Sequence, residues 1–93
     1  MIRPGTQADV PEIEALWRLY VGELRLAGRD YPERLADPDR WRSWLVRRIA
    51  AGDVRVALQD RQVAAYIVWE PASQPDGTRI LRVVDLYVAA DAR

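Results

Sequence analysis

The spacing of apolar residues changes once along this chain, close to Gly52, and this change limits the possible folds more than any other feature. Before Gly52 the apolar residues recur every three or four positions, which is the period of a helix with one buried face. Beyond it, over residues 54–59, apolar and other residues alternate, which is the period of a half-buried strand. A chain that is helical first and extended later buries both patterns by packing its helices on a sheet. The sequence therefore predicts an α/β protein.

The first helix is expected to begin just after a short extended start at residues 2–4. Thr6 to Asp9 has the form of a capping box, in which the Asp9 carboxylate reaches back to the helix start, and Pro11 falls in the first turn. The apolar stripe that follows consists of Val10, Ile13, Leu16, Trp17, Tyr20 and Leu24. Trp17 and Tyr20 are accordingly expected in the core.

A loop over residues 28–36 separates this helix from a second one. Asp37 is the expected N-cap of the second helix, Pro38 its first residue, and Gly52 its C-terminal stop. Its buried stripe is predicted to contain Trp41, Trp44, Leu45 and Ile49.

Three consecutive strands are expected after Gly52. They cover residues 54–59, 63–70 and 79–89, with a tight turn at Asp60 and Arg61 and a flexible loop over 71–77. Residues 63–70 are apolar on both faces, which suits a central strand. The short connections favour antiparallel pairing through hairpins.

Composition excludes several function classes. The 93 residues suffice for one small domain, and 14 basic residues balance 14 acidic ones. A nucleic-acid module needs a basic surplus, and the balanced charge gives no reason to expect a membrane surface as partner. The chain has no Cys and no His, which excludes thiol catalysis, disulfides, Cys/His zinc sites and Ser-His-Asp chemistry within it. No apolar run is long enough to span a membrane and no signal-peptide pattern is present, so we expect a cytoplasmic protein.

Three stretches of the sequence resemble the GNAT superfamily of acyl-CoA-dependent N-acyltransferases. Residues 2–13 resemble the first strand and helix start of that family, and residues 63–68 resemble its third strand, with Ala65 in place of a frequent Gly. Residues 85–93, DLYVAADAR, resemble the fourth strand and the approach to the cofactor loop. The resemblance implies the N-terminal half of a GNAT domain, in the order β-α-α-β-β-β, with two helices packed on a mixed, mostly antiparallel sheet. It also implies that residues 1–93 lack the pyrophosphate-binding loop, of which Arg93 would be the first residue.

The resemblance further implies a reaction. GNAT enzymes transfer an acetyl or other acyl group from CoA to an amine, without a metal, and the acceptor here would be a small-molecule or peptide amine. The backbone of Leu86, Tyr87 and Val88 would pair with the pantetheine arm of acetyl-CoA, and Arg93 would contribute to cofactor binding. Because the phosphate-holding turn would be missing, we expect the 93 residues alone to be inactive.

Asp85 is the candidate catalytic side chain. It stands in an apolar run between Val84 and Leu86, where partial desolvation would raise its pKa and let it act as a general base. The alternative is a structural carboxylate that faces the surface or pairs with Arg55 or Arg82.

Tyr31 and Glu70 are candidates for the acceptor pocket. Tyr31 belongs to the loop after the first helix, a region that shapes the acceptor site in the family. Glu70 stands at the expected end of a strand, where the alternative is a solvated carboxylate.

A second hypothesis comes from a different class of function. If no further strand pairs with residues 79–89, that strand is an exposed apolar edge able to template pairing. The chain would then act by association, as a homodimer or with a complementing C-terminal half.

Overall fold

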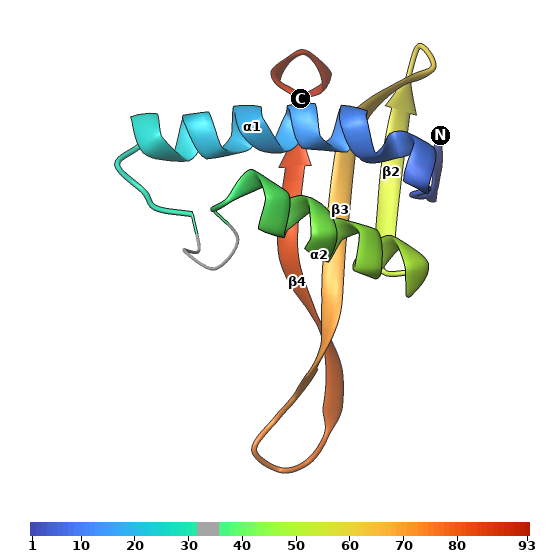
Figure 1. Cartoon of the computed structure of the whole chain (residues 1–93), viewed down its shortest axis with the longest axis vertical. Helices are drawn as coiled ribbons and strands as arrows, with labels where there is room; N and C mark the ends of the chain where they lie inside the picture. The colour runs from blue at the N-terminus through green and yellow to red at the C-terminus, as the bar shows by residue number, and fades with distance from the viewer. Residues whose placement is uncertain (32–35) are drawn as a thin grey trace.

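The computed structural model describes residues 1–31 and 36–93, in which a four-stranded sheet carries two helices on one face (Figure 1). The strands are β1 (Ile2–Pro4), β2 (Val54–Gln59), β3 (Gln62–Ser73) and β4 (Arg79–Val88). The helices are α1 (Val10–Leu26) and α2 (Pro38–Ala50), and short 3₁₀ turns precede α1 (η1, Gln7–Asp9) and follow β4 (η3, Ala90–Ala92).

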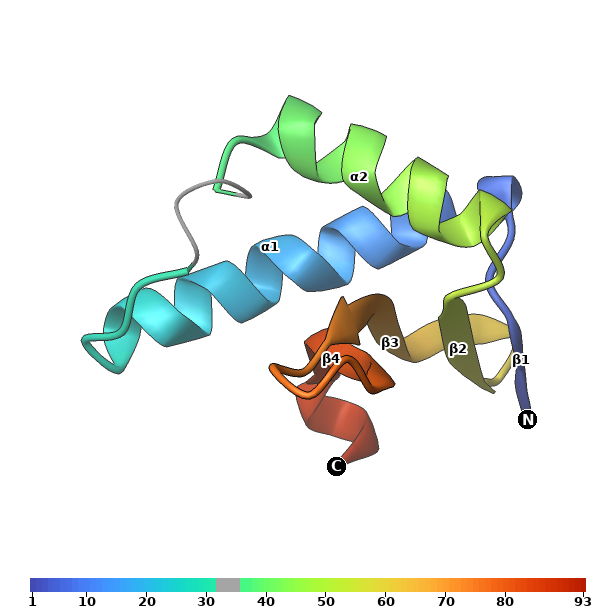
Figure 2. The same cartoon turned by 90° about the horizontal axis from the view of Figure 1, so that it is seen from below.

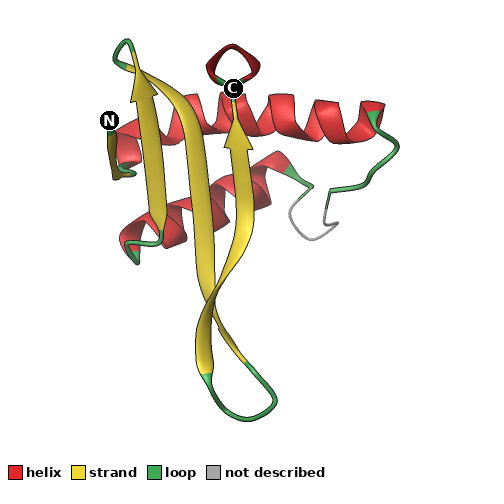
Figure 3. Cartoon of the chain, turned by 180° about the vertical axis from the view of Figure 1, so that it is seen from behind, coloured by secondary structure: helices red, strands yellow, loops and turns green. Residues whose placement is uncertain are grey.

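The strands lie in the sheet in chain order, β1-β2-β3-β4, and every neighbouring pair is antiparallel (Figure 3). This confirms the predicted fold class and the hairpin connections. The pairing of β3 with β4 shifts between two adjacent pairs: Val68 faces Asp85, whereas Trp69 faces Val83. Val84 is therefore an extra residue in β4, and the bulge reverses which side chains of β4 point toward the helices.

The start of α1 is fixed by the buried carboxylate of Asp9, which is 4% exposed. Asp9 Oδ2 accepts the Thr6 backbone N–H at 2.7 Å, as the capping-box pattern predicted. Arg3 adds two bonds, from its two terminal nitrogens, at 2.7 and 2.9 Å. The Arg3 bonds, assisted by the Thr6 bonds, lower the pKa of Asp9 to about 2 against the opposing effect of burial.

The second helix begins and ends where its sequence signals predicted. The Asp37 carboxylate accepts the backbone N–H of Arg40 at 3.0 Å, and Pro38 is the first helical residue. Gly52 has a φ of +80°, the left-handed conformation that ends many helices. Of the loop predicted before this helix, residues 32–35 lie outside the described residues.

The third strand is longer than predicted. β3 continues to Ser73, so the expected loop start at Pro71 is wrong and the turn covers residues 74–78. Cross-strand pairing continues to Ser73 and Arg79, and the resulting twisted arm extends beyond both helices (Figure 1). Pairing along this arm outweighs the turn-forming composition that suggested an earlier stop. Glu70 consequently lies within β3 and not at its end.

The core lies between the helices and one face of the sheet, as Figure 2 shows edge-on. It includes Ile13, Leu16, Trp17, Trp41, Trp44, Leu45, Val54, Val56, Val63, Tyr66, Val68 and Tyr87. Trp17, Trp41 and Trp44 are buried as predicted, and Tyr20 packs at the margin of the core. On the opposite face neither α1 nor α2 covers the sheet, so the second apolar face of β3 is only partly shielded.

Candidate functional site

Asp85 is buried between the sheet and the helices, with 1% of its surface exposed. Its carboxylate accepts three hydrogen bonds from side chains in three different parts of the chain. The Tyr31 hydroxyl donates at 2.5 Å, the Trp41 indole N–H from α2 at 3.2 Å, and the Tyr66 hydroxyl from β3 at 3.2 Å. The residue that the sequence singled out as a base is thus the centre of a polar cluster inside an apolar core.

Burial is the main cause of the raised pKa values in this cluster. Desolvation raises the pKa of Asp85, and the bonds from Tyr31, Trp41, Tyr66 and the Leu86 backbone N–H lower it only in part. Burial, and then the nearby Asp85 charge, raise the pKa values of both Tyr31 and Tyr66. A carboxylate with a raised pKa in a solvent-excluded setting is suited to accept a proton.

The alternative reading of Asp85 as a surface carboxylate or an arginine partner is wrong. Arg82 pairs instead with Glu70 at 2.8 Å. Arg55 donates to the backbone carbonyls of Gly52 and Val54 and lies over the Trp69 ring. No ion pair joins Asp85 to any residue of 1–31 or 36–93.

Tyr31 lies between Asp85 and a surface hollow. Besides its bond to Asp85, it lines a hollow of about 330 Å³ together with Val21, Arg25, Asp30 and Ala36. The structure thus brings together two of the predicted site residues, Tyr31 and Asp85, that are 54 positions apart in the chain.

Glu70 has a largely shielded side chain, 17% exposed. It accepts a bond from Arg82 at 2.8 Å and one from the Trp44 indole at 3.3 Å. These contacts tie the arm of β3 and β4 to α2, so the solvated strand end that the sequence suggested is wrong.

The remaining predicted residues lie at the end of β4. Leu86 is exposed, whereas Tyr87 is buried and donates its hydroxyl to Glu23 at 2.9 Å. Arg93 folds back onto this strand: its Nε donates to the Val88 carbonyl at 2.9 Å and a terminal nitrogen contacts Glu23 at 2.9 Å. The Arg93 guanidinium also lies 5.2 Å from the centre of the Tyr87 ring. These contacts use the Val88 carbonyl, one of the backbone groups for which the family resemblance implied pairing with pantetheine.

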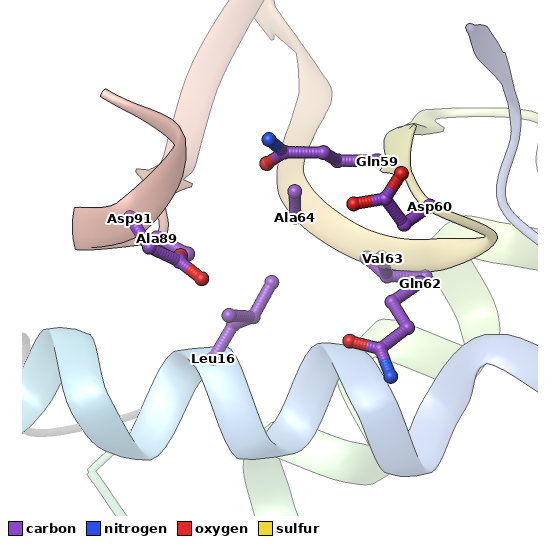
Figure 4. Close-up of a pocket in the computed structure, with 8 residues that line it drawn as sticks. All are labelled: Leu16, Gln59, Asp60, Gln62, Val63, Ala64, Ala89 and Asp91. Carbon is purple, nitrogen blue, oxygen red and sulfur yellow. The ribbon is translucent and has the colours of Figure 1, made fainter.

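A second hollow, of about 300 Å³, opens beside the end of β4 (Figure 4). Leu16 of α1, Ala64 of β3 and Ala89 contribute apolar walls, and the carboxylates of Asp60 and Asp91 lie at its margin. Two negative charges make this hollow unsuited to a phosphate group.

The described residues form neither a metal site nor a membrane-spanning helix. Within 1–31 and 36–93, no group of three or more acidic side chains is arranged to hold a metal ion. No helix in the described part of the chain is both long and apolar enough to cross a bilayer.

Sequence reasoning missed Trp41 and Tyr66 as partners of Asp85. Trp41 was predicted only as part of the buried stripe of its helix, and Tyr66 was not singled out. A Tyr within an apolar strand is a signal for a polar partner, because a buried hydroxyl needs one. Its partner was not readable, because the bulge at Val84 decides which face of β4 carries Asp85.

Comparison with known proteins shows which solved structures share this fold. No family model matches the chain, and no curated protein matches it. Among solved structures, a GNAT-family acetyltransferase from Streptococcus agalactiae superposes with a TM-score of 0.76 at 16% identity, over 98% of this chain and 59% of that one. A ribosomal-protein-alanine N-acetyltransferase from Brucella melitensis superposes with a TM-score of 0.67 at 28% identity, over 100% of this chain and 56% of that one. The chain therefore has the fold of part of a GNAT acetyltransferase and spans 56–59% of the length of these two structures.

Proposed function

We propose that this chain, whose fold is that of the N-terminal part of a GNAT acetyltransferase, forms one side of a site where an acetyl group passes from acetyl-CoA to an amine. The observation that carries the proposal is Asp85, a carboxylate buried at the strand that holds the cofactor in the family. It is held by three donors from separate elements, so its position is fixed before any substrate binds.

In the proposed reaction Asp85 accepts a proton from the acceptor ammonium. The freed nitrogen lone pair then attacks the thioester carbonyl carbon, and backbone N–H groups of β4 stabilise the oxyanion. When the intermediate collapses, the carbon–sulfur bond breaks, the attacking nitrogen gives up its second proton to the leaving CoA thiolate, and the amide and the free thiol form. The backbone of Leu86, Tyr87 and Val88 pairs with the pantetheine arm, which requires Arg93 to release the Val88 carbonyl.

The acceptor is a small-molecule or peptide amine. The Brucella structure is named as an enzyme that acts on an alanine of a ribosomal protein, which favours a peptide amine here. Tyr31 would line the route of the acceptor toward Asp85, and Glu70 would support α2 from the sheet. No metal takes part in the proposed chemistry.

Residues outside this chain would have to hold the pyrophosphate. The 93 residues contain no Gly-x-Gly turn opening a helix, which is the kind of site that binds such anions. We therefore propose that the chain alone is inactive and that a complementing C-terminal half restores acetyl-CoA binding.

Calorimetry tests this proposal directly. Acetyl-CoA is titrated into the chain alone, and into the chain mixed with the remaining C-terminal part of the Brucella enzyme. We expect heat of binding and acetyl transfer to a peptide amine only in the mixture. Asp85→Asn should abolish transfer in the mixture, whereas the exposed Asp39→Asn should leave it intact. Micromolar binding of acetyl-CoA by the monomeric chain alone would contradict the proposal that residues outside this chain are needed to bind the cofactor.

The second candidate function is association through β4, favoured by its exposed apolar side chains. Leu81, Val83 and Leu86 are 62%, 54% and 53% exposed, and no described strand pairs with the outer edge of β4. Such an edge is a template for a second strand.

Sedimentation at micromolar concentration tests the association hypothesis. A dimer that Val83→Lys dissociates would support it, because a charge at the edge opposes pairing. A folded monomer over the whole concentration range would count against it. The expected cytoplasmic location remains a prediction, which cell fractionation would check.

A further inference from the structure

The side chain of Arg93 connects the end of β4 to helix α1. Figure 2 shows α1 and the chain end on opposite sides of β4, so the contact between them spans the end of this strand. Arg93 Nε donates to the Val88 carbonyl at 2.9 Å, and a terminal nitrogen donates to Glu23 of α1 at 2.9 Å. The guanidinium also lies 5.2 Å from the centre of the Tyr87 ring. Three contacts thus hold a side chain that is 49% exposed and open to a ligand from solvent.

Glu23 is the counter-charge of this arginine. One carboxylate oxygen accepts from Arg93, and the other accepts the Tyr87 hydroxyl at 2.9 Å. The bond from Arg93, and then the bond from Tyr87, lower the pKa of Glu23, so the carboxylate is charged at neutral pH. Among residues 1–31 and 36–93, no other charged side chain pairs with Glu23 or with Arg93.

The same contacts occupy groups that the proposed reaction needs. A pantetheine amide N–H that pairs with the Val88 carbonyl has to displace Arg93 Nε from it. An anion that binds the Arg93 guanidinium has to compete with Glu23. The two ends of a CoA molecule, its phosphates and its pantetheine arm, therefore compete with two bonds of a single side chain.

We propose that Glu23 and Arg93 form a latch, which closes the end of β4 in the free chain and which a pyrophosphate group opens. A guanidinium binds phosphate oxygens through paired, charge-assisted bonds, whereas its pair with an exposed carboxylate contributes little. The anion therefore draws Arg93 away from Glu23, and the guanidinium leaves the Val88 carbonyl at the same time. The pantetheine arm then pairs with a strand end that was closed before the anion bound.

This inference rests on the proposed function in one respect, that the ligand is an acyl-CoA. It adds an order to cofactor binding, in which the phosphates bind before the pantetheine arm. The latch consists of residues of this chain alone, so it can be measured without a complementing half.

Two probes, used separately and together, represent the two ends of the cofactor. The ¹⁵N,¹³C-labelled chain is titrated at pH 7 and constant ionic strength with inorganic pyrophosphate, with pantetheine, and with pantetheine after saturation by pyrophosphate. The Arg93 Nε–H signal, the Glu23 carboxyl carbon and the amides of residues 86–89 are followed by NMR. We expect pyrophosphate to move the Arg93 and Glu23 signals saturably. Pantetheine should move the amides of residues 86–89 only when pyrophosphate is present. An equal response to pantetheine with and without pyrophosphate would overturn the latch.

The variant Glu23→Gln tests what holds Arg93. Gln keeps the shape of the side chain and an oxygen for the Tyr87 hydroxyl, but it removes the charge that competes with the anion. We expect it to bind pyrophosphate about two- to fivefold more tightly than the parent chain. If Glu23 instead positions Arg93 for the anion, Glu23→Gln will bind pyrophosphate more weakly, and that result would reject the latch.

The variant Arg93→Gln tests what closes the strand. It should bind pantetheine without pyrophosphate, and pyrophosphate should no longer change the Glu23 signal. Arg79→Gln, which removes an exposed arginine of β4, is the matched control and should behave as the parent chain does. If Arg93→Gln shows no response to pantetheine, the Arg93 side chain is not what closes the strand, and the proposal is wrong.

Failure of the latch and failure of the proposed function give different results. Acetyl transfer by the complemented mixture, together with an Arg93→Gln chain that does not respond to pantetheine, would reject the latch and support the enzyme. A latch that opens with pyrophosphate, in a chain whose complemented mixture transfers no acetyl group, would support the latch and reject the enzyme.

Discussion

Two buried aspartates show how neighbouring residues decide what the same side chain does. Asp9 is held by the Arg3 guanidinium and by the start of a helix, so its charged form is favoured. Asp85 is held by neutral donors only, so burial favours its protonated form. The first is a structural carboxylate, and the second has the properties of a site for proton transfer.

Replacing Asp9 by Asn should destabilise the chain in a way that depends on pH. A carboxyl whose pKa falls from 3.8 to about 2 on folding contributes about 2 kcal/mol above its unfolded pKa, and this contribution is lost as the pH falls from about 4 to about 2. Because the Arg3 side chain is 35% exposed, solvent screening reduces the value to on the order of 1 kcal/mol. Urea unfolding at pH 7 and at pH 2.5 checks this, with Asp39→Asn as control. If Asp9→Asn lowers the free energy of unfolding equally at pH 7 and at pH 2.5, the contribution of Asp9 is not electrostatic.

Replacing Asp85 by Asn should have the opposite pH dependence. A carboxyl whose pKa is higher in the folded than in the unfolded state stabilises the fold in acid, and that stability is lost as the pH rises from 3.8 through the raised pKa. The parent chain should therefore lose stability relative to Asp85→Asn over this range. Thermal unfolding of both chains from pH 3 to pH 8 gives the difference. A difference that does not change with pH would show that Asp85 is not the group that titrates.

In the sequence, burial of Asp85 was one of two alternatives, and its hydrogen-bond partners were not readable. Its apolar neighbours Val84 and Leu86 are visible in the chain, whereas the donors come from the loop, α2 and β3. Their convergence depends on tertiary packing and on the single extra residue in β4. The capping of both helices was predictable because each cap is local, but Arg3 as a partner of Asp9 was not.

At the scale of elements, the turn between β2 and β3 holds residues other than Gly in the left-handed conformation, which is unfavourable for them. Asp60 and Arg61 have φ values of +52° and +65°, so two consecutive residues other than Gly are left-handed. This conformation matches the twist of the flanking strands, and Asp-Gly is the sequence that adopts it most readily. The chain tolerates the strain because the cross-strand pairs on either side fix the turn.

Arg61→Gly should relieve this strain. We expect the free energy of unfolding to rise by about 0.5–1 kcal/mol, because Gly adopts a positive φ without a steric penalty. Arg61→Ala is the matched control, since it removes the charge and keeps the strain. Urea titration measures the free energy of unfolding of the parent chain and of both variants. If Arg61→Ala stabilises the chain as much as Arg61→Gly, the effect comes from loss of the arginine charge and not from the backbone conformation.

The elements were predictable to the extent that their signals are local. Both helices and β2 have their ends at Pro, Gly or Asp residues that act within one turn of the chain. The end of β3 was missed because Pro71 reads as a turn residue, whereas its pairing with Leu81 depends on a strand ten residues further on.

At the scale of the whole molecule, the sheet is covered on one face only. The open face carries a shallow apolar hollow of about 190 Å³, to which Ala57, Ala65, Ile67 and Leu86 contribute. A contiguous apolar surface of this kind marks a contact site or a tendency to aggregate.

Replacing Ile67 and Leu86 together by Thr should remove the apolar character of this face. Thr is β-branched and suits a strand, so we expect the free energy of unfolding to change by less than about 1.5 kcal/mol. Native-state fluorescence of a hydrophobic dye should fall, while Ile13→Thr in the core should instead unfold the chain. Unchanged dye fluorescence in a folded double variant would show that the dye binds elsewhere.

The order of the strands has a consequence for how the chain reaches its fold. β2, β3 and β4 pair through short turns, so these contacts can form in succession with little loss of chain entropy. β1 pairs with β2 across both helices, with Ile2 opposite Ala57, and among the strand pairings of residues 1–31 and 36–93 it is the one that must close a long loop. We therefore expect the three-stranded meander to appear early in refolding and the docking of β1 to set the rate of the last step.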